Sequence, residues 1–525
     1  MKPSPAGAVS LGVLCAQAAA KWPGRTALCF DATGDTLSFS QLETRSNQLA
    51  HALIALGVMP GDRVAVLAGN RPVFPLAWLG IAKAGACMVP VNPAYRDADA
   101  QHLLAHAEVK LAIADSERAS LLRRLRPHTA SLQTMLVDSP GGSLQGDEQD
   151  LWARMRLMPK APVELEVAPD SLANVQFTSG TTGLPKGCML SHRYWTQLGR
   201  LIADELVNLG PQDVMLTAQP FSYIDPQWNV AAMLASGATL VVLDRFSPSR
   251  FWTKVVAHGA TFFYCLGAMP ALLLAQPASA AERAHKLRVV MCSGIPADRH
   301  GELEARFGVP WREVYGTTET GADAMVYEDR AQALLGSGSI GVALPHRELR
   351  IGDVDASPLP RGLVGELLIR GTAMMDGYFR NAEATTQAFA HGWYHTGDLA
   401  TMDAQGQVRI VGRIKDMIRR SGENISAAEV EAVIEQHPAV LLAAVVAIPD
   451  AMRGEESKAF FVLREPHQAM DAEALAAFVE SRLARFKVPR YWEQREDLPR
   501  TPSERVAKHL LPRTHDAAVG YDRCP

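Results

Sequence analysis

Cysteine is scarce in this 525-residue chain, and the few cysteines are scattered along it. No two of them form a C-x-x-C pair, and their number is odd. This pattern excludes a disulfide framework and a zinc site built from clustered thiolates, and it is typical of reduced thiols in a cytoplasmic protein. The seven cysteines lie at positions 15, 29, 87, 188, 265, 292 and 524.

Long apolar runs are also absent. No uninterrupted apolar stretch reaches the roughly 18 residues that a membrane-spanning helix requires. The apolar segment 6–20 follows one lysine and ends in small residues, so it resembles either a signal peptide or an amphipathic first helix. A single lysine is a weak positive region, and Leu11, Leu14 and Ala18 fall on one helical face, which favours the helix.

Neither sign of charge dominates. Lys plus Arg number 52 and Asp plus Glu number 56, which gives a net charge of −4. A near-neutral chain argues against nucleic acid as the main partner. Hydrophobic residues at 48% and charged residues at 21% are ordinary for a globular protein, which excludes a disordered or collagen-like chain. The chain is long enough to form roughly three or four domains of typical size.

Strand-like and helix-like segments alternate through the first 400 residues. Segment 63–67 is predicted as a strand, 78–84 as helical and 86–91 as a second strand, and the same texture recurs at 212–245 and 261–293. Such alternation predicts an α/β fold with parallel sheet.

The pattern of predicted strands and helices changes after residue 400. Segment 407–420 is predicted to contain a strand, a turn and a basic stretch. Helix 427–436, strands 440–448 and 458–463 and helix 471–484 are expected to follow. This α+β material predicts a second, smaller domain whose boundary lies near Lys415.

Residues 178–187, Thr-Ser-Gly-Thr-Thr-Gly-Leu-Pro-Lys-Gly, form the strongest motif. They follow the predicted strand 172–177. Small residues allow the backbone to approach an anion closely, and the hydroxyls and one lysine supply donors and charge, which suits a polyphosphate. The motif is not a Walker A loop, because Pro185 stands where the second glycine is needed. The alternative is that these residues form a flexible linker. A linker would not require several hydroxyl side chains followed by Pro-Lys-Gly, so the sequence favours a phosphate loop.

A second glycine pattern, Gly-Ser-Gly-Ser-Ile-Gly at 336–341, matches a dinucleotide fingerprint only literally. That fingerprint must open a helix after a strand, whereas here Pro345 follows closely and no helical period begins. A nicotinamide or flavin site is therefore not expected.

The motif at 178–187 resembles the phosphate loop of the adenylate-forming superfamily, which contains acyl-CoA synthetases, adenylation domains and luciferases. Further motifs follow in the family's order over essentially the whole chain: YGTTET at 315–320, YHTGD at 394–398 and GRIKD at 412–416. Among subfamilies, the carnitine/crotonobetaine-CoA ligase-like branch is the most similar. The residue patterns shared with that branch lie at 225–232, 251–255 and 485–500.

The resemblance implies a fold and a domain division. A large N-terminal domain, residues 1–413, is expected to hold parallel α/β-layered sheets and a small β-barrel-like part. A small mobile α+β domain, residues 417–525, is expected to rotate about a hinge at Lys415 between two half-reactions.

The resemblance also implies residue roles. Tyr315 is expected to stack on adenine, Thr318 to contact the α-phosphate, and Asp398 and Arg413 to contact the ribose. The expected nucleotide-binding set is Ser179, Gly180, Thr181, Thr182, Gly183, Gly294, Tyr315, Gly316, Thr317, Thr318, Asp398 and Arg413. The expected catalytic residues are Thr178, Lys186, Glu319 and Arg505, of which Thr178 and Glu319 would hold Mg²⁺. The expected CoA-binding residues are Arg420, Gly422 and Glu423, and the expected acyl-pocket residues are Tyr223, Asp225 and Ser293.

Arg505 departs from the family pattern, because relatives place a lysine there that bridges the acid's carboxylate and the α-phosphate. Lysine is a compact point charge and arginine a wide planar fork, so adenylation is expected to be slow. Lys508 would substitute only if the loop shifts.

Two local features allow alternative interpretations. Asp225, before Pro226, either caps a helix, which the Asp-Pro pair favours, or pairs with the cation of a quaternary-ammonium acid beside Tyr223 and Trp228. Arg419 and Arg420 either pair with CoA phosphates or form a solvated basic face.

Together these features predict an ATP-dependent carboxylic acid:CoA ligase. It would form an acyl-adenylate and then an acyl-CoA thioester, releasing AMP and pyrophosphate, with ATP, Mg²⁺ and CoA. Two alternatives are an enzyme that loads a carrier protein, and a nucleotide-binding variant impaired by Arg505. The expected substrate partner is a small carboxylic acid of undetermined identity; no nucleic acid is expected, and a homodimer is left open.

Overall fold

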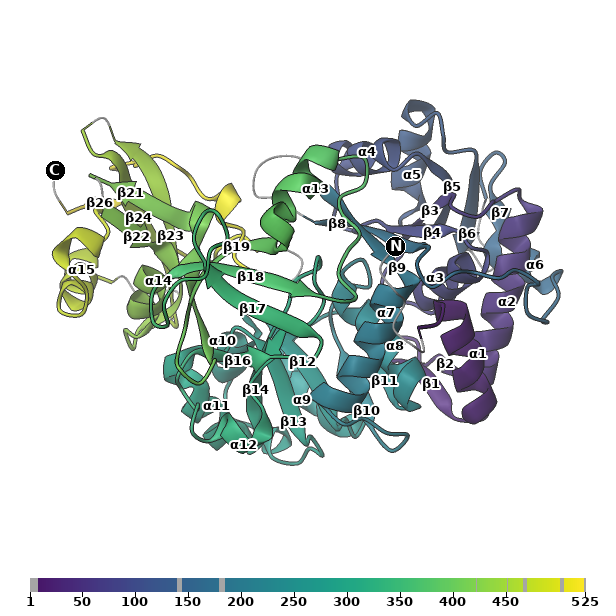
Figure 1. Cartoon of the computed structure of the whole chain (residues 1–525), viewed down its shortest axis with the longest axis horizontal. Coiled ribbons are helices and arrows are strands. Elements are labelled where there is room, and N and C mark those ends of the chain that lie inside the picture. Colours follow the sequence, from purple (N-terminus) through teal and green to yellow (C-terminus); the bar gives the residue numbers. More distant parts are fainter. Residues whose placement is uncertain are drawn as a thin grey trace.

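The computed structural model describes residues 8–138, 144–178, 185–421, 423–450, 452–465, 470–500 and 505–523. Three sheets form the frame of these residues, and helices cover and separate them (Figure 1). None of the described helices is both long and apolar enough to cross a membrane.

The largest sheet has thirteen strands in the order β17-β18-β19-β20-β16-β15-β14-β13-β12-β10-β11-β1-β2. Its parallel part runs from β14 to β1, as the alternating sequence texture predicts. The strands are β1 (Thr26–Phe30), β2 (Thr36–Ser38), β10 (Val214–Thr217), β11 (Thr239–Val242), β12 (Phe262–Leu266), β13 (Val289–Ser293), β14 (Trp311–Tyr315), β15 (Ala324–Met325), β16 (Ser339–Ala343), β17 (Arg347–Gly352), β18 (Gly365–Gly371), β19 (Tyr394–Met402) and β20 (Val408–Arg413).

Strands β15 to β20 are the barrel-like part implied by the family resemblance. They form an open antiparallel extension of the large sheet, and no closed barrel exists among the described strands. The literal dinucleotide fingerprint ends inside β16 and opens no helix. A Cβ at Gly341 would lie 1.7 Å from the Met325 carbonyl oxygen, so this glycine permits the close approach of β15 and β16.

The second sheet has seven strands in the order β7-β6-β5-β3-β4-β8-β9, parallel except for the β8–β9 pair. Strand β3 has the predicted bounds 63–67. The strands are β3 (Arg63–Leu67), β4 (Cys87–Pro90), β5 (Val109–Asp115), β6 (Thr134–Asp138), β7 (Gln149–Asp150), β8 (Leu172–Thr178) and β9 (Lys186–Ser191).

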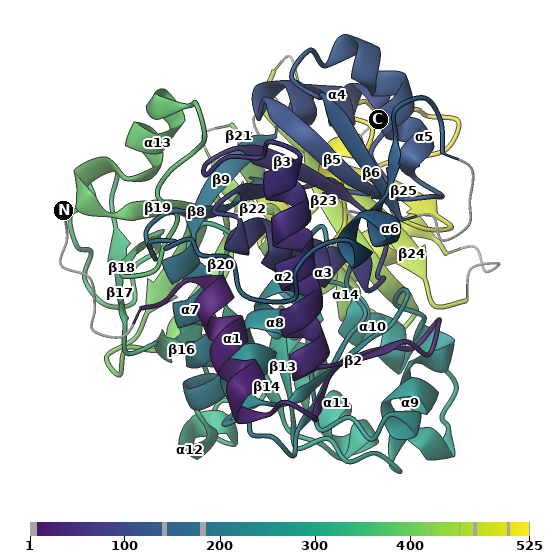
Figure 2. The ribbon, with the colours of Figure 1, turned by 90° about the vertical axis from the view of Figure 1, so that its right-hand side faces the viewer.

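Helices lie between these two sheets and on their outer faces. The largest core takes side chains from both sheets and from α1, α2, α3, α7 and α8, while two further cores cover the outer faces. Figure 2 shows α1, α2 and α3 side by side. The helices of this part are α1 (Leu11–Lys21), α2 (Phe39–Ala55), α3 (Val73–Lys83), α4 (Asp97–His106), α5 (Ala119–Leu125), α6 (Leu151–Arg156), α7 (His192–Leu201), α8 (Ile224–Ser236), α9 (Pro248–Ala257), α10 (Met269–Leu274), α11 (His300–Phe307), α12 (Glu328–Ala331) and α13 (Ala382–Ala388).

The predicted first helix is present as α1. Leu11, Leu14 and Ala18 are buried, as the spacing indicates, and Ser10 caps the helix by accepting a hydrogen bond from the Val13 amide. Cys15 lies on the same buried face, and burial raises the pKa of its thiol to about 12. The six described cysteines are free thiols.

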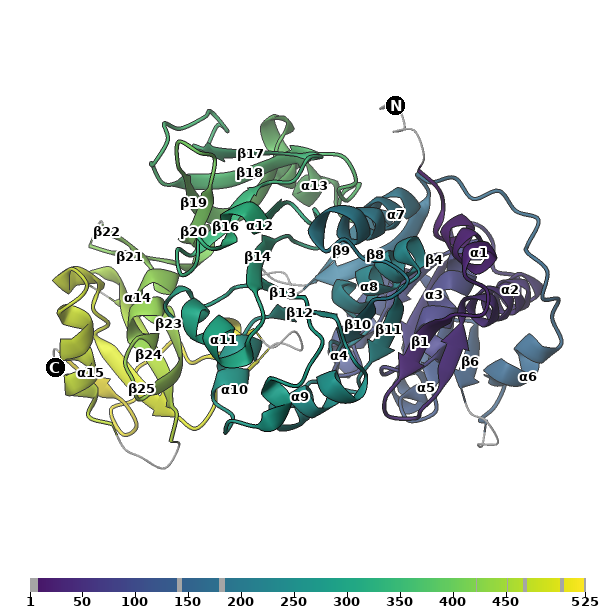
Figure 3. The same cartoon turned by 90° about the horizontal axis from the view of Figure 1, so that it is seen from below.

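The third sheet occupies one end of the molecule with its own apolar core (Figure 3). Its strands are β21 (Met417–Arg420), β22 (Glu423–Ser426), β23 (Val440–Asp450), β24 (Gly454–Leu463), β25 (Tyr491–Arg495) and β26 (Tyr521–Asp522), and its helices are α14 (Ala427–Glu435) and α15 (Ala472–Glu480). A separate apolar cluster joins β23 and β24 to residues of α10, so this sheet packs against the larger part of the chain.

Candidate active site

The end of β8 and the start of β9 frame the predicted phosphate loop. Thr178 pairs with Lys186 across these antiparallel strands, and its hydroxyl donates to the Lys186 carbonyl at 3.4 Å. The pairing places Lys186 opposite Thr178, at the start of β9. The predicted residues Ser179, Gly180, Thr181, Thr182 and Gly183 lie outside the described residues.

Lys186 and Glu319 meet at Tyr378, which sequence analysis did not single out. The Tyr378 hydroxyl donates to Glu319 Oε1 at 3.1 Å. Lys186 Nζ lies 5.1 Å from the centroid of the Tyr378 ring. Two predicted catalytic groups of opposite charge therefore share one aromatic neighbour.

The segment 315–320 follows β14 and turns tightly. A Cβ at Gly316 would lie 1.9 Å from the Gly321 carbonyl oxygen, so only glycine fits there. Tyr194 donates to the Thr318 carbonyl at 3.0 Å, and the Thr317 and Thr320 hydroxyls lie 2.9 Å apart. These contacts fix the backbone that carries Glu319.

A buried ion pair supports the same segment from below. Arg347 Nε lies 2.6 Å from Asp323 Oδ1, and the two side chains are 1% and 0% exposed. The Arg347 guanidinium also donates to the Thr320 carbonyl, and the Thr320 hydroxyl donates to Asp323. The pair thus fixes the segment directly after Glu319.

Three predicted nucleotide-binding residues come together beside this segment. The Tyr315 hydroxyl donates to Asp398 Oδ2 at 2.6 Å, and Arg413 Nε lies 2.7 Å from Asp398 Oδ1. Asp398 on β19 pairs with Arg413 on β20. Burial, together with the Asp398 charge, raises the pKa of the Tyr315 phenol, so it remains a hydrogen-bond donor.

Gly294 follows β13 with a positive φ of 94°. The Glu313 carboxylate accepts hydrogen bonds from the amides of Gly294 and Ile295 at 2.6 and 2.8 Å, and burial raises its pKa to about 7. Sequence analysis missed Glu313. Glu313 lies two residues before Tyr315, on the strand next to β13. That position is the sequence signal for a side chain that binds the amides of Gly294 and Ile295.

The predicted acyl-pocket residues lie around the start of α8. The Tyr223 hydroxyl accepts from Asn92 Nδ2 at 2.9 Å, and Tyr264 donates to Ser293 Oγ at 2.7 Å. The rings of Trp228 and Tyr264 meet edge to face, with centroids 5.3 Å apart.

The helix-cap interpretation of Asp225 is wrong. Tyr223 is the N-cap of α8, and Asp225 is the second helical residue, whose carboxylate accepts from Trp228 Nε1 at 3.3 Å. Burial raises the pKa of Asp225 to about 6, and the positive charge of Arg505 opposes that rise. Arg505 and Asp225 therefore influence the same pocket.

Lys508 pairs with an acidic residue of the C-terminal part. Its Nζ lies 2.6 Å from Glu431 Oε1 on α14. The compact cation that follows Arg505 in the chain is thus engaged within the C-terminal part.

The predicted hinge and CoA-binding residues lie where β20 passes into the third sheet. Lys415 is in the short turn Ile414–Asp416 between β20 and β21. Arg420 Nε lies 2.8 Å from Glu456 Oε1, whose side chain is buried. Glu423 is exposed at the start of β22, and Gly422 lies outside the described residues.

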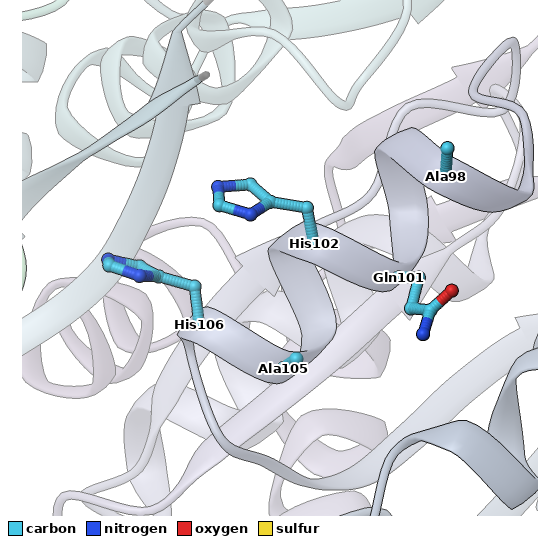
Figure 4. Close-up of a pocket in the computed structure, with 5 residues that line it drawn as sticks. All are labelled: Ala98, Gln101, His102, Ala105 and His106. Carbon is cyan, nitrogen blue, oxygen red and sulfur yellow. The ribbon is translucent and has the colours of Figure 1, made fainter.

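A surface hollow of about 490 Å³ lies on α4, and its described lining comes from that helix alone. Figure 4 shows the His102 and His106 rings on one side of the helix and Gln101 on another. His106 Nε2 is 3.0 Å from the Phe379 carbonyl, and the Phe379 amide donates to the Gly187 carbonyl at 2.7 Å. The hollow thus adjoins the phosphate-loop strands without containing the predicted catalytic residues.

Comparison with known proteins places this arrangement in a family. The model for "AMP-binding enzyme" matches residues 15–379, and the model for "AMP-binding enzyme C-terminal domain" matches residues 429–505. Crotonobetaine/carnitine–CoA ligases from Salmonella paratyphi A and from a strain of Escherichia coli are each 34% identical, over 93% of this chain and 96% of theirs.

Solved structures agree with this result. A benzoate CoA ligase from Burkholderia xenovorans superposes with a TM-score of 0.85 at 26% identity, covering 95% of this chain and 99% of its own. The o-succinylbenzoate CoA synthetase from Bacillus subtilis, solved with its acyl-adenylate intermediate, gives a TM-score of 0.82 at 26% identity, covering 97% and 99%. Because the family model and these relatives cover most of the sequence, the chain belongs to the AMP-binding enzyme family.

Proposed function

We propose that this chain is an ATP-dependent carboxylic acid:CoA ligase that works through an acyl-adenylate. The placement of Lys186 and Glu319 around Tyr378, beside the Tyr315, Asp398 and Arg413 cluster, carries the proposal. It supplies a cation for a triphosphate, a carboxylate for its counter-ion and a polar cluster for a nucleoside in one place. The buried and half-buried free thiols fit the cytoplasmic location that the cysteine pattern predicts.

Magnesium fits this residue set. The described residues contain no group of three or more His, Cys, Asp or Glu that would hold a metal by themselves. Mg²⁺ usually keeps several waters and binds through one or two carboxylates together with substrate phosphates, so Glu319, with the Thr178 hydroxyl, would hold it together with those phosphates. When bound, it would neutralise charge on the phosphates.

The chemistry has two balanced steps. The acid's carboxylate oxygen attacks the α-phosphorus, the bond to the bridging oxygen breaks, and pyrophosphate leaves. The Lys186 ammonium stabilises charge that develops on the phosphates. The thiol of CoA then loses its proton and attacks the acyl carbon, and AMP leaves. Rotation of the C-terminal part about Lys415 would exchange the residues that face the site.

Acid-dependent release of pyrophosphate from ATP, followed by thioester formation, tests the proposal. CoA is expected to accept the acyl group at least as well as the phosphopantetheine of a holo carrier protein. Preference for the carrier protein would contradict the acceptor assignment. Absence of pyrophosphate release with every member of an acid panel, comprising betaine, aliphatic and aromatic acids, would contradict the adenylation step.

Asp225 suggests the class of acid. A half-buried carboxylate beside the Trp228 and Tyr264 rings suits a quaternary-ammonium group, because charge attraction and cation–π contact act together. The names of the crotonobetaine/carnitine relatives point to the same class. We therefore propose an acid that carries a cation at its far end.

A pH series tests this substrate class. The pKa of Asp225 is raised to about 6, so its carboxylate is charged above that pH and neutral below it. The KM for a betaine acid is expected to rise as the pH falls through about 6, whereas the KM for an uncharged acid of equal length stays flat. Asp225→Asn should have a high betaine KM at every pH. A wild-type betaine KM that is independent of pH between 5 and 8 would contradict the role of Asp225.

Arg505 is expected to limit the first step. In Arg505→Lys, a compact ammonium replaces the planar fork and bridges the substrate carboxylate and the α-phosphate more closely. We expect the rate of pyrophosphate release to rise roughly tenfold, the value of about one charge-assisted hydrogen bond. Arg500→Lys, a nearby change of the same kind, is the control. An unchanged rate in Arg505→Lys would show that the arginine does not limit adenylation.

A further inference from the structure

Tyr378 is held in place on several sides. Residues 376–379 lie along β9, where the Met189 amide donates to the Gly377 carbonyl at 2.9 Å and the Phe379 amide to the Gly187 carbonyl at 2.7 Å. The Tyr378 amide donates to Thr385 Oγ1 at 2.9 Å, and its side chain is buried. The ring therefore has a defined position next to Lys186.

The same segment fixes Glu319. The Met375 amide donates to the Glu319 carbonyl at 2.8 Å, so the backbone before Tyr378 and the backbone of the predicted magnesium ligand are joined directly. The phenol then reaches the Glu319 carboxylate at 3.1 Å. Main chain and side chain thus orient one carboxylate together.

Lys186 and Glu319 carry opposite charges in one partly buried site, where such charges attract strongly. Yet neither forms an ion pair with another described residue. The Tyr378 side chain interacts with both the ammonium and the carboxylate without bringing these two groups into contact. Its face attracts the ammonium, which lies 5.1 Å from the ring centroid, within the range of a cation–π contact. Its hydroxyl gives the carboxylate a charge-assisted hydrogen bond.

We propose that Tyr378 is a positioning residue that keeps Lys186 and Glu319 apart, so that the ammonium stays free for the triphosphate and the carboxylate for magnesium. This inference rests on the proposed adenylation function. The ring supports the lysine and the hydroxyl orients the glutamate, so the two contributions are separable by substitution.

The test compares Tyr378→Phe with Tyr378→Leu. Phenylalanine keeps the ring and removes the hydroxyl, whereas leucine removes both. Tyr327→Phe is the matched control, because the Tyr327 hydroxyl has no hydrogen-bond partner among the described residues. Two quantities are measured: the Mg²⁺ concentration that half-saturates pyrophosphate release, and the Kd of ATP by calorimetry with and without Mg²⁺. Thermal unfolding of each variant shows whether it is folded.

In Tyr378→Phe, the half-saturating Mg²⁺ concentration is expected to rise roughly tenfold, the value of one charge-assisted hydrogen bond. The Kd of ATP without metal should stay unchanged. In Tyr378→Leu, the Kd of ATP should also rise several-fold without metal. Tyr327→Phe should match the wild type.

The outcomes separate this inference from the proposed function. If the wild-type chain releases no pyrophosphate with any acid, the proposed function is wrong. If the wild type is active and Tyr378→Phe keeps the wild-type magnesium dependence, the positioning role is wrong, even where the variant has lost thermal stability. If the leucine variant does not fold, the magnesium dependence of Tyr378→Phe is sufficient to test the positioning role.

Discussion

Replacing Lys186 with methionine is expected to lower kcat/KM for acid-dependent pyrophosphate release by roughly a hundredfold or more, the usual effect of removing one group that stabilises transition-state charge. Lys186 is the first residue of β9, and its pairing with Thr178 fixes its backbone. Its ammonium lies over the Tyr378 ring and forms no ion pair with any described residue. The charge is therefore available to the phosphates.

The experiment separates a chemical role from a structural one. Methionine retains the length of the side chain and packs against an aromatic ring, so the unfolding temperature should change little. Thioester formation from added acyl-adenylate and CoA should stay near the wild-type rate, because pyrophosphate has already left. Lys160→Met, at an exposed lysine, is the control. Unimpaired pyrophosphate release in Lys186→Met would remove the basis of the proposed mechanism.

The parallel part of the fold was predictable from the sequence because its signals are local. The segment 63–67 lies between a Gly-Asp turn and a helical pattern, and it forms β3 with those bounds. The strand before the phosphate loop was predictable for the same reason, since it ends where the small residues begin. The open extension of strands β15 to β20 depends instead on pairing between strands that are distant in sequence, and local patterns do not encode such pairing.

The site shows the same division. Tyr315, Asp398 and Arg413 were identified through motifs, and the structure brings them together. Tyr378 was not identified, because its contact with Glu319 spans 59 residues of sequence and a single tyrosine in an irregular segment has no pattern of its own.

Asp225 shows how one local contact replaces the one that a local preference indicates. The Asp-Pro pair indicates a helix cap, yet α8 begins two residues earlier than a cap at Asp225 would require, with Tyr223 as its N-cap. The carboxylate is then directed to the Trp228 indole, a partner supplied by the next turn of the helix. Propensity placed the helix correctly and misassigned the side chain.

Breaking the buried pair beneath the active-site turn is expected to have the largest effect on stability. Arg347→Met leaves the Asp323 carboxylate buried without its partner, which should lower the free energy of unfolding by about 3–5 kcal/mol. The exposed pair of Arg124 and Asp97 provides a contrast, since its side chains are 55% and 54% exposed. Arg124→Met should cost less than about 1 kcal/mol. Urea unfolding of the two variants measures the difference.

A double variant shows whether the cost arises from the unpaired charge. Arg347→Met combined with Asp323→Leu removes both charges and should recover much of the lost free energy, because well-packed apolar side chains often replace a buried pair without loss. In the double variant the Thr320 carbonyl still lacks the Arg347 guanidinium and the Thr320 hydroxyl still lacks the Asp323 carboxylate, so ATP affinity should remain reduced although stability recovers. Equal costs for Arg347→Met and Arg124→Met would show that the pair does not hold the turn. Recovery of stability without recovery of ATP binding would instead identify the pair as the support that aims Glu319 at the nucleotide.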